Sequence, residues 1–129
     1  MPLDTAGIAA ALGRPVSLGG GVYKVSFPRQ EAVRVNGEEI PASMGLATAI
    51  GFQPTGGGKA VATGDFVLSA DEVNSVIRVL REHGIAVTSL HNHLLLDDPH
   101  LFFMHFWGNG DAVEIARGLH AALALMAVR

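Results

Sequence analysis

Residues 64–85 read GDFVLSADEVNSVIRVLREHGI, and they predict a strand that passes directly into a helix. Ser69 and Glu72 stand at the spacing of a capping box, in which each side chain satisfies a backbone N–H at the start of the helix. Apolar residues then recur at helical spacing over Val73–Leu80, and Gly84 supplies a stop signal. The stretch therefore predicts one amphipathic helix between two strands.

Outward from this helix, the chain predicts short elements separated by turn residues. The expected helices cover residues 5–12 and the segment that opens at Asp111, and the expected strands are 22–27, 33–35, 46–53, 59–68, 85–93 and 101–107. Gly108–Gly110 is expected to break the chain before the last helix. Because strands joined by short loops favour antiparallel pairing, residues 1–129 predict a single α+β domain. We expect a mostly antiparallel sheet of about six strands packed with two to three helices.

Composition narrows the class of protein. The chain has 129 residues, of which 49% are hydrophobic, and this suits one globular core rather than disorder. The net charge is -3 and the sequence contains no basic cluster, so we expect no nucleic-acid partner. The absence of cysteine excludes disulfides and thiolate sites. No signal peptide is visible, and the apolar run 121–128 is shorter than the roughly 20 residues that span a bilayer. The sequence as written predicts a soluble protein with no membrane insertion, in the cytoplasm.

Three histidines stand on two neighbouring predicted strands. Side chains two residues apart on a strand point to the same face, so His91 and His93 project together. Only residues 94–100 connect this strand to the one that carries His105, so an antiparallel hairpin is expected. If its centre lies near Asp98, His91 is almost opposite His105 and the three imidazoles converge.

Three converging imidazoles match the three-ligand, open-position geometry of a catalytic zinc site. The predicted ligands are His91, His93 and His105, and zinc or another divalent transition metal is the expected ion. Phe103 and Trp107 share a face with His105 and are expected to wall a pocket for a small molecule. The alternative interpretation is that these histidines are ordinary strand residues that bond carbonyl groups or meet solvent.

Other conspicuous residues have structural explanations. His83 falls in the last turn of its helix, His120 lies off the apolar stripe of the last helix, and His100 belongs to a loop. Gly56–Lys59 looks like a phosphate loop, but the full spacing GxxxxGK[ST] is absent and a strand follows, which predicts a hairpin tip. The nearest candidates for a general base are Asp65, Asp97 and Asp98.

Four strings are specific in combination: GGVYKVSFPR (Gly20–Arg29), GDFVLSADEVNSVIRVLREHGI (Gly64–Ile85), LHNHLL (Leu90–Leu95) and FFMHFWG (Phe102–Gly108). Together they resemble the LppY/LpqO family, a bacterial family of unknown function named for lipoproteins, over nearly the whole chain. The resemblance implies that His91, Asn92, His93 and His105 occupy signature positions. Members often carry an export signal and two copies of the domain, whereas this chain shows one copy and no signal. His100 also stands where an arginine is expected.

Three functions follow from these residues. The first is a metal-dependent hydrolase or lyase, in which the ion lowers the pKa of a bound water to about 7. The second is a module that binds a small molecule or a metal without turnover, and the third is a structural or assembly domain. Because related chains carry two copies, a homodimer with two-fold symmetry is also expected.

Overall fold

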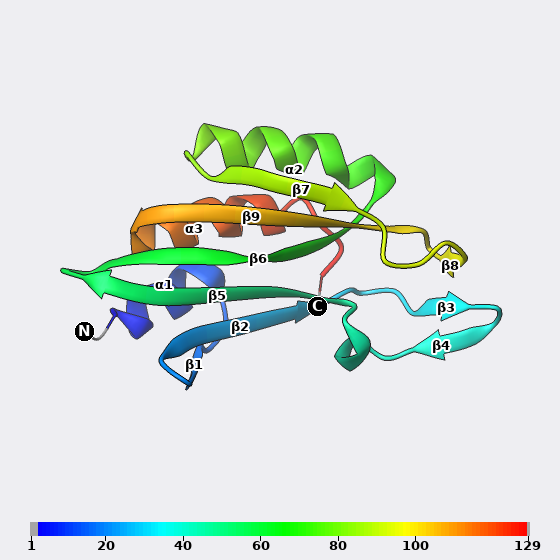
Figure 1. The fold of residues 1–129 in the computed structure, drawn as a ribbon, viewed down its shortest axis with the longest axis horizontal. Helices are drawn as coiled ribbons and strands as arrows, with labels where there is room; N and C mark the ends of the chain where they lie inside the picture. The colour runs from blue at the N-terminus through cyan, green and yellow to red at the C-terminus, as the bar shows by residue number, and fades with distance from the viewer. Residues whose placement is uncertain (1–2, 129) are drawn as a thin grey trace.

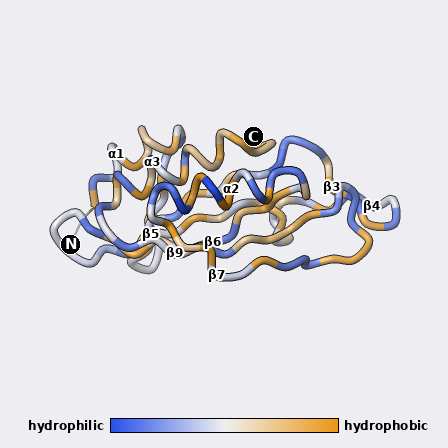
Figure 2. The backbone as a smooth tube through the Cα atoms, turned by 90° about the horizontal axis from the view of Figure 1, so that it is seen from above, coloured by the Kyte–Doolittle hydropathy of each residue, from blue (hydrophilic) through white to orange (hydrophobic). Residues whose placement is uncertain are grey.

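The computed structural model describes residues 3–128 and arranges them in two layers (Figure 1). One layer is a six-stranded antiparallel sheet, with the strand order β1-β2-β5-β6-β9-β7. Its strands are β1 (Ser17–Gly19), β2 (Val22–Pro28), β5 (Ala47–Gly56), β6 (Lys59–Ser69), β9 (Leu101–Asp111) and β7 (Ala86–His91). The other layer holds the helices α1 (Thr5–Leu12), α2 (Ala70–Glu82) and α3 (Ala112–Leu123), all on one side of the sheet (Figure 2).

A second, smaller sheet stands at one end of the large one (Figure 1). It has the strand order β4-β3-β8, with β3 (Val33–Val35), β4 (Glu38–Ile40) and β8 (Asp97–Asp98). A short 3₁₀ helix, Ala42–Met44, leads from β4 into β5. The architecture confirms the predicted α+β class with a mostly antiparallel sheet.

The helices begin where the sequence predicts, although α3 ends at Leu123, before Met126 of the predicted apolar stripe. The Asp4 carboxylate accepts a hydrogen bond from the backbone N–H of Gly7 at 2.9 Å, and Gly13 closes α1 with a φ of 82°. The capping box of α2 is formed, and the backbone N–H of Ser69 donates to Glu72 at 2.8 Å. Asp111 caps α3 by accepting from the backbone N–H of Glu114 at 3.0 Å.

Strand alternation divides the large sheet into two faces. Alternate residues of β2, β5, β6 and β9 point toward the helices and form the main core, among them Val25, Phe27, Ile50, Phe52, Phe66, Leu68, Met104 and Phe106. The predicted face of β5, with Thr48, Ile50 and Phe52, is buried accordingly. The opposite face is covered only at the end near the small sheet, where a second core forms from Val33, Leu46, Val67, Leu101 and Phe103.

The predicted boundaries of two strands are wrong. The strand expected over 85–93 ends at His91, so His93 lies outside β7. The expected break at Gly108–Gly110 is also absent, because β9 continues to Asp111 and pairs with β6 along its whole length. Ladder hydrogen bonds to a neighbouring strand therefore override the local tendency of glycine to end a strand. Strands β1, β4 and β8 were not expected either.

A buried ion pair ties four segments together below the end of β2. Arg29 and Glu72 are 3% and 11% exposed, and Nη1 of Arg29 donates to Glu72 at 2.6 Å. Arg29 also donates to Glu31 and to the carbonyl oxygen of Val67. Glu72 accepts a further hydrogen bond at 2.8 Å from the backbone N–H of Ala127. Burial alone would raise the pKa of Glu72, but these hydrogen bonds outweigh it and lower the pKa.

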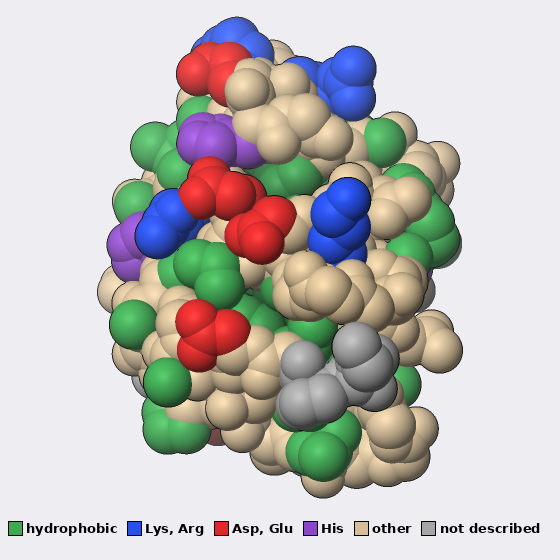
Figure 3. Space-filling model, turned by 90° about the vertical axis from the view of Figure 1, so that its left-hand side faces the viewer, with side chains coloured by type: hydrophobic (Ala, Val, Ile, Leu, Met, Phe, Trp, Pro, Cys, Tyr) green, Lys and Arg blue, Asp and Glu red, His purple; other side chains and the backbone are tan. Residues whose placement is uncertain are grey.

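The surface carries both signs of charge. At the end of the molecule shown in Figure 3, acidic and basic side chains lie among hydrophobic ones, without a continuous patch of either sign. None of the helices in residues 3–128 has the length and apolar composition that crossing a bilayer requires.

Candidate functional site

The uncovered part of the sheet, on the side away from the helices, carries most of the polar side chains that the strands present. We call it the open face. Strand pairing places its residues in two rows across the sheet, Ser17-Lys24-Gly51-Thr63-Trp107 and Ser26-Ala49-Asp65-His105-Ser89. Directly paired residues of neighbouring strands share a face, so the side chains in both rows point to the open face.

Two adjoining hollows are set into the open face. One, of about 430 Å³, lies over β2, β5 and β6 and includes Lys24 and Ala49 in its lining. The other, of about 410 Å³, lies toward the β5–β6 turn and includes Trp107. Both are lined by Gly51 and Thr63, which mark the place where they meet. Both have volumes in the range of small-molecule sites.

A chain of three polar side chains begins at Thr63, which lines both hollows, and continues to His105 and Asp65. Nδ1 of His105 lies 2.9 Å from Oδ1 of Asp65, and Nε2 of the same ring lies 3.0 Å from Oγ1 of Thr63. The His105 and Asp65 side chains are 44% and 36% exposed. Thr63 and Asp65 come from β6 and His105 from β9, and the direct pairing of Asp65 with His105 brings the three together.

The hydrogen bonds determine which nitrogen of His105 carries a proton. An ionised carboxylate only accepts, so the bond to Asp65 places a proton on Nδ1. In the neutral ring, Nε2 is then an unprotonated acceptor directed at the Thr63 hydroxyl. This is the arrangement of a general base that is held in one tautomer by a carboxylate.

The predicted histidine cluster is arranged differently from the expectation. Strands β7 and β9 are antiparallel neighbours, as expected, but His91 pairs with Phe103, and His105 pairs with Ser89. The expected pairing of His91 with His105 is therefore wrong by two residues, although both side chains lie on the same face. The segment between the strands does not form a symmetric hairpin, because part of it leaves to pair as β8 with β3.

His93 lies flat on Phe103, with ring centroids 3.4 Å apart and an interplanar angle of 5°. The ring of His91 is 5.1 Å from that of His93, again measured between centroids. Phe103 is fully buried in the second core, whereas Trp107 is 46% exposed. Of the two predicted pocket residues, Trp107 thus lines a hollow and Phe103 lies beneath an imidazole.

Asn92, between the two histidines, is engaged by the backbone. Its side chain donates a hydrogen bond to the carbonyl oxygen of Leu101 at 2.7 Å. Within residues 3–128, no three His, Asp or Glu side chains form a group that could hold a metal ion. The site formed by His91, His93 and His105 stays a prediction.

The other candidates lie apart from the open face. Asp97 is buried and accepts hydrogen bonds from the backbone N–H of Leu101 at 3.0 Å and from Nδ1 of His100 at 2.5 Å. These bonds hold the turn before β9, and Asp98 beside them is exposed. His83 donates from Nδ1 to the carbonyl oxygen of Val79 at the end of α2.

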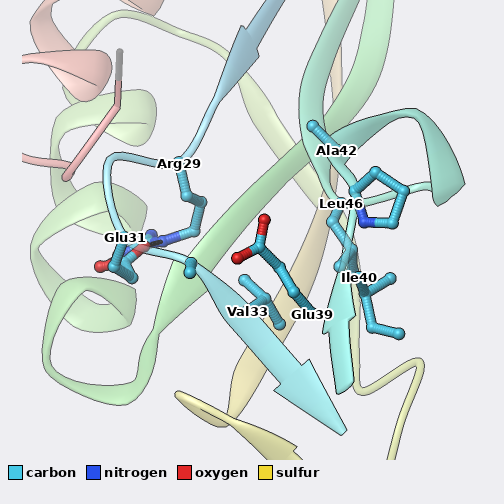
Figure 4. A pocket seen from close by; sticks show the side chains of 9 residues that line it. Arg29, Glu31, Val33, Glu39, Ile40, Ala42 and Leu46 are labelled. Carbon is cyan, nitrogen blue, oxygen red and sulfur yellow. Dashed lines mark hydrogen bonds and ion pairs between the residues drawn. The ribbon is translucent and has the colours of Figure 1, made fainter. Parts of the chain in front are cut away.

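A third hollow, of about 200 Å³, opens between the small sheet and the end of β2. Figure 4 shows the Glu39 carboxylate directed into it, with Ile40 and Leu46 on one side and Arg29 and Glu31 on the other. The Arg29 guanidinium is held by Glu31 and Glu72. The Glu39 carboxylate in turn pairs with Arg34 at 3.6 Å. The charged groups named around this hollow are therefore engaged with one another or with neighbouring residues.

Sequence reasoning named His105 and Asp65 separately but did not place them together, and it missed Thr63. The available signal was the alternation Thr63, Asp65, Val67, which puts two polar side chains on one face of an otherwise apolar strand. The partner of that face could not be identified without knowing that β6 lies beside β9.

Comparison with known proteins gives one match. The family model described as Domain of Unknown Function (DUF1259) matches residues 6–125. No curated protein and no solved structure matches the chain.

Proposed function

The chain belongs to the family described as Domain of Unknown Function (DUF1259), and from the geometry of its open face we propose that it is a hydrolase of small esters. His105 is the general base in this proposal, and Asp65 orients its ring. The observation that carries the proposal is the hydrogen-bonded pair of Asp65 and His105 beside two hollows of small-molecule size.

The exposure of the Asp65 carboxylate favours catalysis at this pair over a purely structural role. A carboxylate that only stabilises the fold is usually enclosed, as the fully buried side chain of Asp97 is beside His100. The two imidazoles are about equally exposed, but the Asp65 carboxylate is 36% exposed, on a face that no helix covers. Nε2 of His105 lies 3.0 Å from the hydroxyl of Thr63, which lines both hollows, so the base is next to the space that a substrate would occupy.

The test uses two matched histidine variants. A panel of carboxylic esters, phosphoesters and lactones is offered to the wild-type chain, to His105→Gln and to His100→Gln. Each variant removes a histidine that is bonded to an aspartate, but only His105 also contacts Thr63, which lines both hollows. We expect the wild type to hydrolyse at least one class, His105→Gln to lose about 10²–10⁴-fold, and His100→Gln to retain the rate. Equal rates for wild type and His105→Gln, or no hydrolysis of any substrate, would refute the proposal.

A metal site is the second candidate. The rings of His91 and His93 lie 5.1 Å apart between centroids, and His91 is on the face that also carries His105, which supports two imidazole ligands at one place. Zinc or a similar divalent ion bound there could activate a water for hydrolase or lyase chemistry. Elemental analysis of untagged protein tests this candidate, because it requires near-stoichiometric metal that is lost in a His91→Ala variant.

Two further proposals concern relatives and assembly. We propose that the LppY/LpqO family is related to this chain, on the strength of the four strings that resemble it. We also propose a homodimer, since related chains carry two copies of the domain. A domain that binds a small molecule without turnover, or that serves assembly alone, remains the alternative if the ester panel shows no hydrolysis.

A further inference from the structure

Thr63 is the hydroxyl-bearing residue of the open face that lies where the two hollows meet. It lines both hollows, and its paired neighbour on β5 is Gly51, which lines them too and places no side chain next to it. Its neighbour on β9 is Trp107, whose ring is partly exposed and lines the second hollow. A small molecule lying over Gly51 would therefore contact the Thr63 hydroxyl from the open side.

The hydroxyl of Thr63 has one proton and two acceptors within reach. It donates to the carbonyl oxygen of Phe106 at 3.0 Å, and Nε2 of His105 is also 3.0 Å away. Because Nδ1 carries the proton shared with Asp65, Nε2 can take the hydroxyl proton. Nucleophile, base and orienting carboxylate thus stand in hydrogen-bond contact in that order.

We propose that Thr63 is the nucleophile and that carboxylic ester hydrolysis proceeds through an acyl-Thr63 intermediate. This inference rests on the proposed function, because it uses the same base. Thr63 Oγ1 bonds to the ester carbonyl carbon while its proton passes to Nε2 of His105. The bond to the alcohol oxygen then breaks, and the alcohol leaves with the proton from Nε2. Water repeats the sequence on the acyl-threonine, which releases the carboxylic acid and restores the hydroxyl.

The charge around Thr63 suits this step. Lys24 lines the first hollow together with Thr63 and lies two strands away, about 10 Å between Cα atoms at the usual strand spacing. Within the described part of the chain, no carboxylate pairs with Lys24. A positive charge therefore lines the same hollow as Thr63, where it favours negative charge on the oxygen of a carbonyl group bound there.

The experiment combines covalent labelling with hydrolysis, using the full 129-residue chain. A fluorophosphonate probe should label Thr63, because Oγ1 displaces fluoride from phosphorus and its proton goes to His105. Intact mass and peptide mapping locate the adduct. The variants are Thr63→Val, which keeps the side-chain shape without the hydroxyl, Thr63→Ser, which restores it, and His105→Gln. Thr88→Ala, which changes an exposed threonine of β7, is the control.

We expect the probe to label position 63 in the wild type, in Thr63→Ser and in Thr88→Ala. The label should be lost in Thr63→Val and in His105→Gln. Hydrolysis of p-nitrophenyl acetate should fall more than about 10²-fold in Thr63→Val and recover in Thr63→Ser. If Thr63→Val hydrolyses the ester normally while His105→Gln does not, His105 activates water directly. That result would refute the role of Thr63 as nucleophile and would leave the proposed function standing. The absence of an adduct on Thr63 in the wild type would refute this role as well, whatever the rate of hydrolysis.

Discussion

Replacing Glu72 by glutamine should remove a large part of the stability of this domain. The Glu72 carboxylate accepts hydrogen bonds from Arg29, from the backbone N–H of Ser69 and from that of Ala127. Glutamine has nearly the same size but offers one acceptor oxygen and one NH₂ group. The NH₂ group would face an N–H donor wherever it is placed, so at least one donor loses its acceptor.

The magnitude follows from burial. Removing one partner of a buried ion pair costs about 3–5 kcal/mol, since the remaining charge is left without compensation. Arg29 keeps Glu31 as a second partner, which places the expected cost near the lower limit, about 3 kcal/mol. Small domains are stable by roughly 5–15 kcal/mol, so the variant should fold but with a much smaller margin.

Urea denaturation measures this loss directly. With a slope of about 2 kcal/mol per M, a cost of 3 kcal/mol lowers the urea midpoint by about 1.5 M. Glu114→Gln is the matched control, because Glu114 pairs with Arg117 at side chains that are 66% and 62% exposed. Its midpoint should move by no more than about 0.3 M, the equivalent of about 0.5 kcal/mol. Equal shifts in the two variants would show that the buried pair is not a main support of the fold.

Four further outcomes are expected. The pKa of Glu72 lies below its ordinary value of 4.5, so the contribution of this carboxylate to stability is complete above pH 4.5 and is lost as pH falls through the folded-state pKa. The urea midpoint of the wild type should therefore drop in that pH range, and the midpoint of Glu72→Gln should drop much less. Gly64→Ala should destabilise the chain by several kcal/mol in the same assay, because a Cβ at Gly64 would lie 1.9 Å from the carbonyl oxygen of Ala49. An unchanged urea midpoint would mean that β5 and β6 can separate at this position without cost. If three histidines hold zinc, adding zinc at about 100 times its Kd after chelation should stabilise the fold by about 2.7 kcal/mol in thermal melts, and His91→Ala but not His83→Ala should abolish the effect. Light scattering should give twice the chain mass of 13.5 kDa, and a mass equal to one chain at all concentrations would refute the homodimer.

Elements whose signals are local can be predicted from the amino-acid sequence. Asp4 with Gly13, Ser69 with Glu72, and Asp111 each act within one helical turn, and the predicted starts of α1, α2 and α3 agree with the structure. The buried face of β5 was likewise predictable, because alternation along one strand depends only on that strand. These features need no knowledge of what packs against them.

The register of the strands and the composition of the candidate site depend on the assembled sheet. Local pattern cannot show that β9 lies between β6 and β7, which is why Asp65, 40 positions earlier in the chain, was not recognised as the partner of His105. The irregular pairing between Val87 and Ser89 and the departure of β8 toward β3 then set His91 opposite Phe103. Hydrogen bonds between distant strands form only when the whole sheet assembles, and a slip of two residues preserves the face of every side chain. The sequence could therefore predict the face that each histidine shares but not the neighbour that it meets.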